Sequence, residues 1–375
     1  MGKHCHELPE ALPGIWVAMK SSHVFNNNMY RFSRISTKLS SFIYKHSLPV
    51  NGREELMSKV SMALFRLLRK GVLLMGDPPC EMNIRGKTMA MPLSHQLPSY
   101  TSFFANYDSN LLRISDFLRA RDGYLHQIDV GANIGDSILA CFNSASDVFL
   151  AIEPCSLFHA YLKTNLGKFP TNVILEKFLC ASTNGHTNIQ VNQIQGTAAF
   201  KVISSSRGES IESRTVDSAV RQHPIFADCN FLKIDTDGYD FDVIKGAINL
   251  IGSATPFVLF ESYPFGNMDY FKQVKATLSF FAKSGYTQAV VYDNTGNIFT
   301  VLSLEDFKAF DHALLYELIG DHLYFDILVL KHAPDFVRLE YAYFLNAIAD
   351  RVRKQAAIDA IESIHRSEIE CGNQL

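Results

Sequence analysis

Residues 127–137 combine an acidic residue, a glycine turn and a helix pattern in an order that can bind a nucleotide. Asp129 lies near the end of an apolar strand pattern, and the turn Gly131-Ala-Asn-Ile-Gly135 follows it. Apolar residues at helical spacing begin at Ile138, directly after the turn. A strand, a glycine turn and a helix in this order are typical of the nucleotide-binding corner of an α/β sheet.

The spacing of the glycines indicates which nucleotide fits. A dinucleotide site favours Gly-x-Gly-x-x-Gly, because the second glycine lets the backbone approach a pyrophosphate. Here Asn133 and Asp136 hold the second and third positions, and Asp136 adds negative charge where a pyrophosphate would bind. The turn therefore favours a cofactor with positive charge and no phosphate, such as S-adenosylmethionine (SAM). We expect Asp129, Gly131, Asn133 and Gly135 to bind it.

A second acidic residue, Glu153, ends the next apolar run, 148–152, about one strand–helix–strand unit after Asp129. A carboxylate at this position can accept hydrogen bonds from both ribose hydroxyls, and this role is shared by NAD and SAM sites. We therefore add Glu153 to the expected cofactor contacts. The alternative is that Glu153 caps the helix that follows.

A third motif, Leu232-Lys-Ile-Asp-Thr-Asp-Gly238, completes a set that covers roughly residues 80–331. The set resembles the FkbM-type SAM-dependent methyltransferases. The resemblance implies a class I methyltransferase fold and O-methylation of a hydroxyl on a sugar, glycolipid or natural product. The family usually has Glu where this chain has Asp237, which shortens the side chain by one methylene. The other motifs of the set are Asp129–Gly135, Ile152-Glu-Pro154, Arg214-Thr-Val-Asp217 and Ile244-Lys-Gly-Ala247.

Carboxylates at the ends of two predicted strands are candidate catalytic groups, because strand ends face the ligand crevice in an open α/β sheet. Methyl transfer to an alcohol requires removal of a proton, so we predict Asp237 and Glu261 as catalytic residues and Asp235 as a further cofactor contact. Alternatively, these oxygens could bind Mg²⁺, which would lower the pKa of the hydroxyl. His95, in a segment expected to cover the site with Tyr100 and Tyr107, is an additional candidate base.

Other polar residues near these motifs have simpler explanations. Asp240 and Asp242 fit the first turn of a helix, where the helix dipole favours acids. Lys233 is expected to pair with a neighbouring carboxylate. His223 and His312 are isolated in the sequence and are assigned to the surface or the core rather than to catalysis.

Strand and helix patterns alternate regularly from residue 124, which predicts a Rossmann-like α/β fold with a seven-stranded, mostly parallel sheet. A hairpin is expected within 183–210, and Asp293-Asn-Thr-Gly296 fits a turn between two late strands at an antiparallel end of the sheet. The seven strands are predicted near 126–130, 148–152, 173–178, 230–234, 257–261, 287–292 and 325–330.

Three parts are predicted: an N-terminal helical region (1–79), a methyltransferase domain (80–331, core 124–331) and a helical tail (332–375). The first includes a helix over about 51–70, capped by Asn51 and ended by Gly71, with a leucine-rich face. Its opposite face carries Lys59, Arg66 and Lys70 and is expected to be solvated, and a membrane-surface helix is the alternative. A hairpin is predicted around Arg85-Gly86, with its methionines toward a core. The tail is predicted either to pack on its own domain or to form a homodimer contact.

Composition favours a globular enzyme. A net charge of −3 gives no support for nucleic-acid binding, and seven cysteines without a C-x-x-C pair indicate reduced thiols. The N-terminus does not resemble a signal peptide, and no apolar stretch is long enough for a transmembrane helix, so a cytoplasmic protein with a small-molecule or glycan acceptor is expected. Two alternatives remain, an NAD-dependent oxidoreductase and a non-catalytic SAM-fold module that binds a partner.

Overall fold

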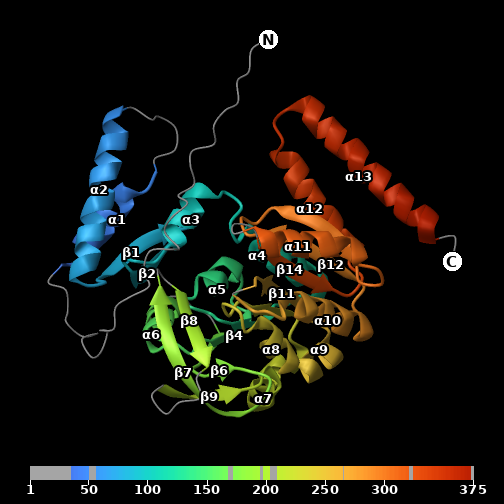
Figure 1. The fold of residues 1–375 in the computed structure, drawn as a ribbon, viewed down its shortest axis with the longest axis horizontal. Coiled ribbons are helices and arrows are strands. Elements are labelled where there is room, and N and C mark those ends of the chain that lie inside the picture. Colours follow the sequence, from blue (N-terminus) through green and yellow to red (C-terminus); the bar gives the residue numbers. More distant parts are fainter. Residues whose placement is uncertain are drawn as a thin grey trace.

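An eight-stranded sheet forms the centre of the protein, as the computed structural model shows (Figure 1). Its strand order is β13-β12-β14-β11-β10-β3-β4-β5. The structure describes residues 35–49, 56–167, 172–194, 197–202, 209–264, 266–320 and 324–372.

Five neighbouring strands of this sheet run parallel, and β14 joins them antiparallel to β11. This arrangement confirms the predicted class I methyltransferase fold. The sheet has one strand more than predicted, because β13 follows the turn at Gly296 and pairs antiparallel with β12. The strands are β3 (His126–Val130), β4 (Val148–Ile152), β5 (Asn172–Glu176), β10 (Phe231–Ile234), β11 (Phe257–Ser262), β12 (Gln288–Asp293), β13 (Ile298–Ser303) and β14 (Phe325–Leu330).

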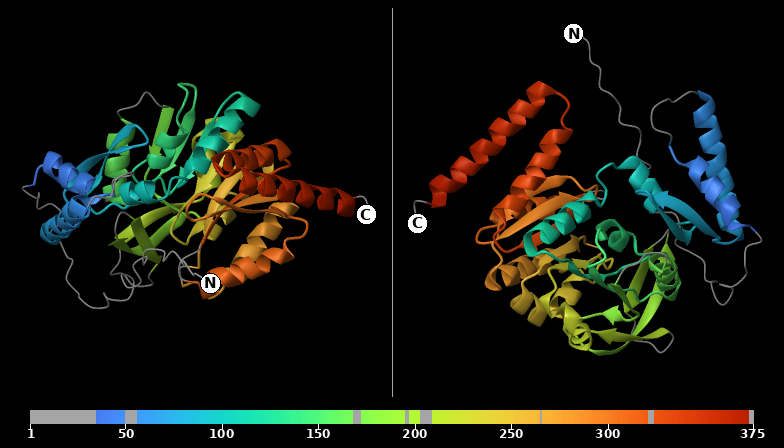
Figure 2. Two further views of the ribbon diagram at one scale, coloured as in Figure 1. Left: turned by 90° about the horizontal axis from the view of Figure 1, so that it is seen from above. Right: turned by 180° about the vertical axis from the view of Figure 1, so that it is seen from behind.

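Both faces of the sheet are buried, because successive side chains of a strand point to opposite faces. In β4, Phe149 belongs to one apolar core and Leu150 to the other. Helices cover both faces (Figure 2). They are α4 (Ser109–Asp122), α5 (Asp136–Cys141), α6 (Ser156–Leu166), α7 (Val216–Gln222), α8 (Asp240–Lys245), α9 (Ile248–Ala254), α10 (Tyr270–Lys283) and α11 (Asp311–Ile319), with 3₁₀ turns η1 (Pro224–Asp228) and η2 (Lys308–Phe310).

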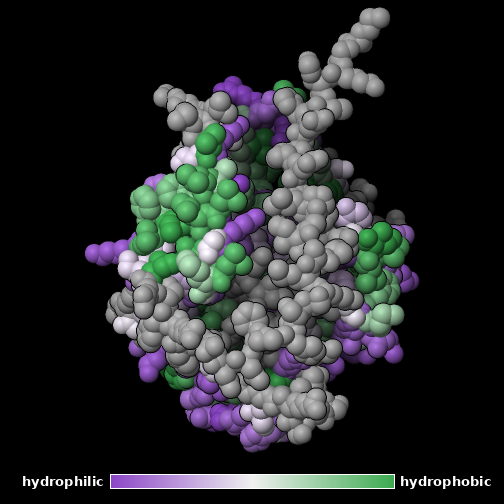
Figure 3. All heavy atoms as spheres, turned by 60° about the vertical axis from the view of Figure 1, so that its left-hand side comes forward, coloured by the Kyte–Doolittle hydropathy of each residue, from purple (hydrophilic) through white to green (hydrophobic). Residues whose placement is uncertain are grey.

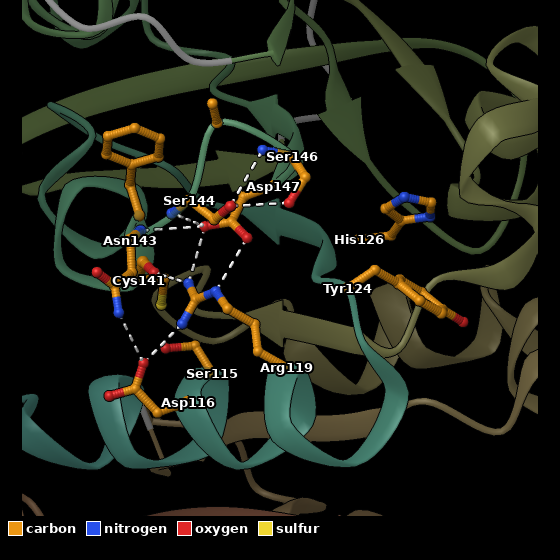
Figure 4. Close-up of polar contacts among 12 residues, drawn as sticks. Ser115, Asp116, Arg119, Tyr124, His126, Cys141, Asn143, Ser144, Ser146 and Asp147 are labelled. Carbon is orange, nitrogen blue, oxygen red and sulfur yellow. Dashed lines mark hydrogen bonds and ion pairs between the residues drawn. The ribbon is translucent and has the colours of Figure 1, made fainter.

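A buried ion pair fixes α4 to the segment that enters β4 (Figure 4). Arg119 of α4 donates from Nε and Nη2 to the two carboxylate oxygens of Asp147, each at 2.9 Å. The same carboxylate accepts the backbone N–H groups of Asn143 and Ser144 at 3.0 Å. Because every partner of this carboxylate is a donor, its burial is compensated, and the loop between α5 and β4 is held in one conformation.

A second, four-stranded sheet lies beside the first, in the order β6-β9-β7-β8. Its strands β7 and β8 pair antiparallel, which confirms the predicted inserted hairpin. The segment Ser204-Ser-Ser-Arg-Gly208, which its sequence predicts to be a loop, lies outside the described residues. The strands are β6 (Leu179–Cys180), β7 (Gly185–Ile194), β8 (Thr197–Val202) and β9 (Glu209–Arg214).

The N-terminal region contains two helices and the predicted hairpin. Arg85 and Gly86 both have positive φ, as a tight two-residue hairpin turn requires, and Met82, Met89 and Met91 are buried as expected. The elements are α1 (Thr37–Ser47), α2 (Leu56–Met75), β1 (Pro79–Ile84), β2 (Lys87–Pro92) and α3 (Leu97–Phe103).

One expectation for this region is wrong. The helix does not end at Gly71 but continues to Met75, because an isolated glycine only weakens a helix. Its leucine-rich face is exposed, since 56% of Leu64 and 65% of Leu67 face solvent. Helix α1 was not expected at all, and the predicted cap, Asn51, lies outside the described residues.

The predicted helical tail is present as α12 (Pro334–Ala347) and α13 (Arg351–Gly372). Helix α12 packs on the sheet through Phe336 and through Glu340, whose carboxylate accepts from Arg113 at 2.6 and 2.8 Å. Helix α13 projects away from the sheet (Figure 2). The domain boundaries after residues 79 and 331, and a dimer contact through the tail, stay predictions. Among the described residues, no helix has the length and apolar character needed to cross a bilayer.

Candidate cofactor and acceptor site

The glycine turn after β3 is shaped by a close approach to β10. Gly131 has φ +82°, and a Cβ placed on it would lie 1.8 Å from the backbone oxygen of Asp235. The two strands are paired here, since the Asp235 N–H donates to the Val130 carbonyl at 3.0 Å. Gly135 also has positive φ, and a Cβ there would lie 2.8 Å from Leu162 Cδ1. Both glycines are therefore required by local geometry.

Glu153 ties the glycine turn to the end of β4. Its Oε2 accepts the Asn133 N–H at 2.9 Å, and its Oε1 accepts the Cys155 N–H at 2.7 Å. Burial raises the pKa of Glu153 to about 7, although these two hydrogen bonds oppose the shift. Cys155, not Glu153, is the N-cap of α6. A buried carboxylate with two backbone donors still has lone pairs that can accept from hydroxyl groups of a ligand.

Asp129 lies beneath the turn and is fully buried. Its Oδ2 accepts from the Ser137 hydroxyl, and its Oδ1 lies 3.4 Å from Lys233 Nζ. Lys233 also contacts Asp235 Oδ2 at 3.1 Å, which confirms the expected pairing. Burial opposes the charge of Lys233, but the two carboxylates outweigh this and raise its pKa well above the usual value. The lysine thus stays charged and joins the ends of β3 and β10.

Five carboxylates gather beyond β10, and we call this group the carboxylate cluster. Glu261 of β11 lies opposite Asp326 of β14 in the strand register, and Asp237 has φ +50° in the loop after β10. Asp326 was not among the residues predicted from the sequence, although it is a single acid inside an apolar strand, which is a recognisable pattern. The members are Asp235, Asp237, Asp240, Glu261 and Asp326.

Mutual repulsion and burial hold protons on this cluster. Burial first, and then the neighbouring carboxylates, raise the pKa of Asp237 to about 7 and the pKa of Glu261 well above its usual value. None of the described residues forms a hydrogen bond with the buried Oε2 of Glu261. A carboxyl group with a pKa near 7 is suited to accept a proton at neutral pH. A cation bound beside the cluster would lower these pKa values.

Asp240 and Asp242 have structural roles, as expected. Asp240 is buried in the first turn of α8, and its carboxylate accepts from the Thr236 hydroxyl at 2.7 Å and from the Glu261 N–H at 3.1 Å. Asp242 accepts the Ser182 N–H at 2.9 Å. Asp240 therefore holds the ends of β10 and β11 together rather than facing a substrate.

The donor set does not fit a divalent metal. Within the described part of the chain, no three His, Cys, Asp or Glu side chains are placed to hold one ion. The two best-placed acids already serve other partners, since Asp240 binds the backbone and Asp235 pairs with Lys233. The Mg²⁺ route considered from sequence therefore has no support in the geometry.

Tyrosine rings lie next to the carboxylate cluster. The rings of Tyr100 and Tyr107, two residues that were predicted to cover the site, stack at 5.3 Å. The rings of Tyr263 and Tyr324, which were not predicted to lie here, meet edge to face at 5.2 Å. Burial raises the pKa of Tyr324 well above its usual value, and Glu261 adds to the shift. The Tyr324 ring therefore remains neutral, and the four rings provide flat apolar surfaces beside the acids.

His95 contacts the glycine turn, but as a hydrogen-bond donor. Its Nδ1 accepts the Leu97 N–H at 3.2 Å, so the neutral ring carries its proton on Nε2, which lies 3.4 Å from Asn133 Oδ1. Burial lowers the pKa of His95 to about 4. With both nitrogens engaged, the geometry suits a residue that positions Asn133 better than one that removes a proton. His223 instead pairs with Glu176 at 2.7 Å.

The structure thus brings the predicted cofactor residues to one corner, at the ends of β3, β4 and β10, with Asp237 and Glu261 beside them. Their roles in binding and catalysis stay predictions. The residues at the corner are Asp129, Gly131, Asn133, Gly135, Glu153 and Asp235.

Several known proteins that are similar to this chain are methyltransferases by name. The hexuronic acid methyltransferase AglP of Haloferax volcanii is 29% identical over 133 residues, which are 36% of this chain and 54% of that protein. The chain therefore spans about half the length of this curated relative. An FkbM methyltransferase from Methylobacillus flagellatus KT superposes with a TM-score of 0.33 and 14% identity, covering 52% of this chain and 54% of the other. The human methyltransferase 10 domain containing protein superposes with a TM-score of 0.37 and 12% sequence identity, and the superposition covers 66% of this chain and 90% of the other.

Residues 129–318 match the methyltransferase FkbM domain. The match begins at Asp129 before the glycine turn and ends in α11, so it contains the glycine turn, Glu153 and the carboxylate cluster up to Glu261. It covers just over half of the chain. The chain belongs to the FkbM methyltransferase family.

Proposed function

We propose that this protein is a SAM-dependent methyltransferase that methylates a hydroxyl group of a sugar, a glycolipid or a related natural product. The observation that carries the proposal is the glycine turn beside a cluster of carboxylates, with Glu153 at the end of the next strand. Such an acidic corner repels a pyrophosphate and attracts a cation. Family membership supports the same donor.

The residues of the corner fit SAM in three places. Glu153 can accept hydrogen bonds from the ribose hydroxyls while its backbone donors keep it oriented. The close approach of Gly131 to Asp235 leaves the turn without a side chain beside the methionine moiety. Asp235, half exposed and paired with Lys233, supplies negative charge for the ammonium group. SAM brings a methyl group that is already activated, so the protein needs to align the acceptor and take its proton.

Two features support a hydroxyl acceptor. Asp237, with a pKa of about 7, is suited to take a proton from an alcohol as the methyl group is transferred. The neighbouring tyrosine rings offer flat apolar surfaces, which pack well against the faces of sugar rings. AglP, a relative over part of the chain, is a hexuronic acid methyltransferase by name, and this supports a sugar acceptor.

Binding and turnover experiments test the proposal separately. Calorimetry with SAM and with NADH should show binding of SAM alone, and binding of NADH instead would contradict the donor assignment. A second assay should follow methyl transfer from labelled SAM to a panel of neutral sugars, uronic acids and glycolipids. Turnover with a sugar hydroxyl supports the acceptor class. SAM binding without turnover on any member of a broad panel would favour a non-catalytic module.

A further inference from the structure

Helix α2 presents an uncovered apolar surface that the candidate site does not explain. Val60, Leu64, Leu67 and Leu68 are 59%, 56%, 65% and 45% exposed. At helical spacing they share one side of α2 with Leu74 and Met75. We call these six residues the α2 apolar face. Figure 3 shows this patch as a green area over the helix, with hydrophilic residues next to it.

Helix α2 is anchored to the protein by its other side. There Val72 is buried, and Arg69 donates to the Leu93 carbonyl at 2.8 and 3.0 Å and lies 3.7 Å above the ring of Tyr44. A surface helix normally turns its most apolar side inward. The orientation of α2 is the reverse, and it is fixed by specific contacts. A contiguous apolar patch of this kind marks an interaction site.

The patch continues onto α1. Leu39 and Phe42 of α1 are half exposed, and the rings of Phe42 and Phe65 meet edge to face at 5.6 Å. Since Phe65 belongs to α2, the two helices form one surface. Their apolar side chains therefore act together rather than as scattered surface residues.

The charge around this surface is strongly positive. Residues 35–76 contain seven Lys or Arg and two Asp or Glu, whereas the whole chain has a formal net charge of −3. Lys59, Arg66 and Lys70 are exposed and follow one flank of the α2 apolar face at spacings of seven and four residues. Arg53 and the two acids, Glu54 and Glu55, lie outside the described residues. Three exposed basic side chains of α2 thus border the exposed apolar face.

We propose that the α2 apolar face docks the protein on the surface of an anionic phospholipid bilayer. An apolar helix face with a basic flank lies in the plane of such a surface, with leucines among the acyl chains and lysines at the headgroups. Twenty residues make α2 about 30 Å long, enough for several leucines to enter the interface together. A second copy is a poorer occupant, because two basic surfaces would repel each other.

Buried contacts link the two helices to the candidate site. The Tyr44 hydroxyl of α1 donates to the His95 carbonyl, and His95 in turn contacts Asn133 of the glycine turn. The inference goes beyond the proposed function and does not depend on it, because lipid binding requires neither SAM nor an acceptor.

Vesicle sedimentation tests the proposal with the full chain. The protein should sediment with vesicles of phosphatidylcholine and phosphatidylserine, less with phosphatidylcholine alone, and less at high salt. L64E/L67E should weaken binding about tenfold or more, and K59E/K70E should weaken it on anionic vesicles only. All four side chains are exposed, so circular dichroism should show an unchanged fold. L315E/I319E, which alters exposed apolar residues of α11, is the matched control and should bind like the wild type.

Three results would overturn the proposal. One is that the wild-type protein fails to sediment with anionic vesicles. Another is that L64E/L67E binds as well as the control variant, which would place the lipid contact elsewhere. The third is that light scattering finds a dimer that L64E/L67E converts to a monomer while neither protein binds vesicles, because a second copy would then occupy the face.

Discussion

The backbone N–H of Asn133 donates to Glu153 Oε2 at 2.9 Å, so the glycine turn and the end of β4 share one buried carboxylate. The second oxygen of Glu153 is held by Cys155. An acid that was predicted to contact a ribose thus also fixes the conformation of the loop that would surround the cofactor. Binding and local order depend on the same side chain.

Replacing Glu153 with glutamine should weaken SAM binding. The NH₂ group of glutamine is a donor, and it would face one of the two backbone N–H groups that now donate to Glu153. The substitution also removes the negative charge that would accept hydrogen bonds from the ribose hydroxyls. Each lost charge-assisted hydrogen bond costs about 1.5–3 kcal/mol, so calorimetry should show an affinity at least about tenfold lower. Glu212→Gln, at an exposed acid on β9, is the control. Unchanged affinity in the Glu153 variant would show that the ribose binds elsewhere.

Gly131→Ala should reduce both stability and SAM binding. A Cβ at this position would lie 1.8 Å from the Asp235 carbonyl oxygen, and φ of +82° is unfavourable for alanine. Clashes and strain of this kind cost about 1–3 kcal/mol, which lowers Tm by several degrees. Gly252→Ala in α9 is the matched control, because nothing lies within 4 Å of its added Cβ. If the two variants have the same Tm and the same SAM affinity, the close approach of β3 and β10 is not rigid.

Much of the fold could be predicted from the sequence, because the buried parallel strands of this chain are short apolar runs that are followed by glycine or acidic residues. The predicted strands 126–130 and 148–152 coincide with β3 and β4. The eighth strand was missed because its burial pattern is mixed, which weakens the apolar signal. The exposed face of α2 shows another limit. Periodicity identifies an apolar side of a helix but not what covers it.

The site was predictable only in part, for a related reason. Acids that follow a strand could be assigned to the sheet edge because parallel strands end together. Asp326 reaches the same place through an antiparallel pairing with Glu261, across a long separation in sequence. The role of His95 depends on the hydrogen-bond partners of its two ring nitrogens, and these cannot be predicted from the residue type.

His95→Phe should impair cofactor binding more than turnover. Phenylalanine keeps the bulk of the ring but cannot donate to Asn133 or accept from Leu97, so the glycine turn loses one support. We expect a several-fold higher KM for SAM, a nearly unchanged kcat and a pH profile of the same shape. A catalytic base would behave in the opposite way, with kcat reduced by about 10²-fold or more and SAM affinity intact.

Stability of the ligand-free protein should fall as the pH rises from about 5 to about 8. Burial raises the pKa of Asp108, Glu153 and Asp237 to about 7 and that of Glu317 to about 8. In this range the folded state holds protons that the unfolded state has released, so the free energy of unfolding decreases with pH. Each retained proton contributes about 1.4 kcal/mol per pH unit.

Thermal unfolding across this range checks the prediction. Tm should decrease toward pH 8 without SAM, and SAM should reduce the decrease, because its positive charge favours the ionised carboxylates. Calorimetry in two buffers of different ionisation enthalpy should then detect proton release on SAM binding. A Tm that rises steadily to pH 8 in the ligand-free protein would show that the cluster is ionised at neutral pH.

Asp237→Asn and Glu261→Gln should separate catalysis from binding. Both variants preserve side-chain size but cannot accept the proton of an acceptor hydroxyl, so turnover should fall about 10²-fold or more while SAM affinity changes little. In the wild type the rate should rise with pH as Asp237 ionises, with a midpoint at or below about 7, because bound SAM lowers that pKa. Asp269→Asn, at an exposed acid away from the cluster, should have no effect.

A chelator distinguishes the two ways of activating the hydroxyl in the same assay. Since no group of side chains in the described structure is placed to hold a metal ion, EDTA should leave the rate and its pH profile unchanged. Loss of activity with EDTA and recovery with Mg²⁺ would instead require a metal-bound acceptor. Full turnover in both Asp237→Asn and Glu261→Gln would exclude the two carboxylates as bases and direct attention to His95, whose low pKa leaves it neutral at the working pH.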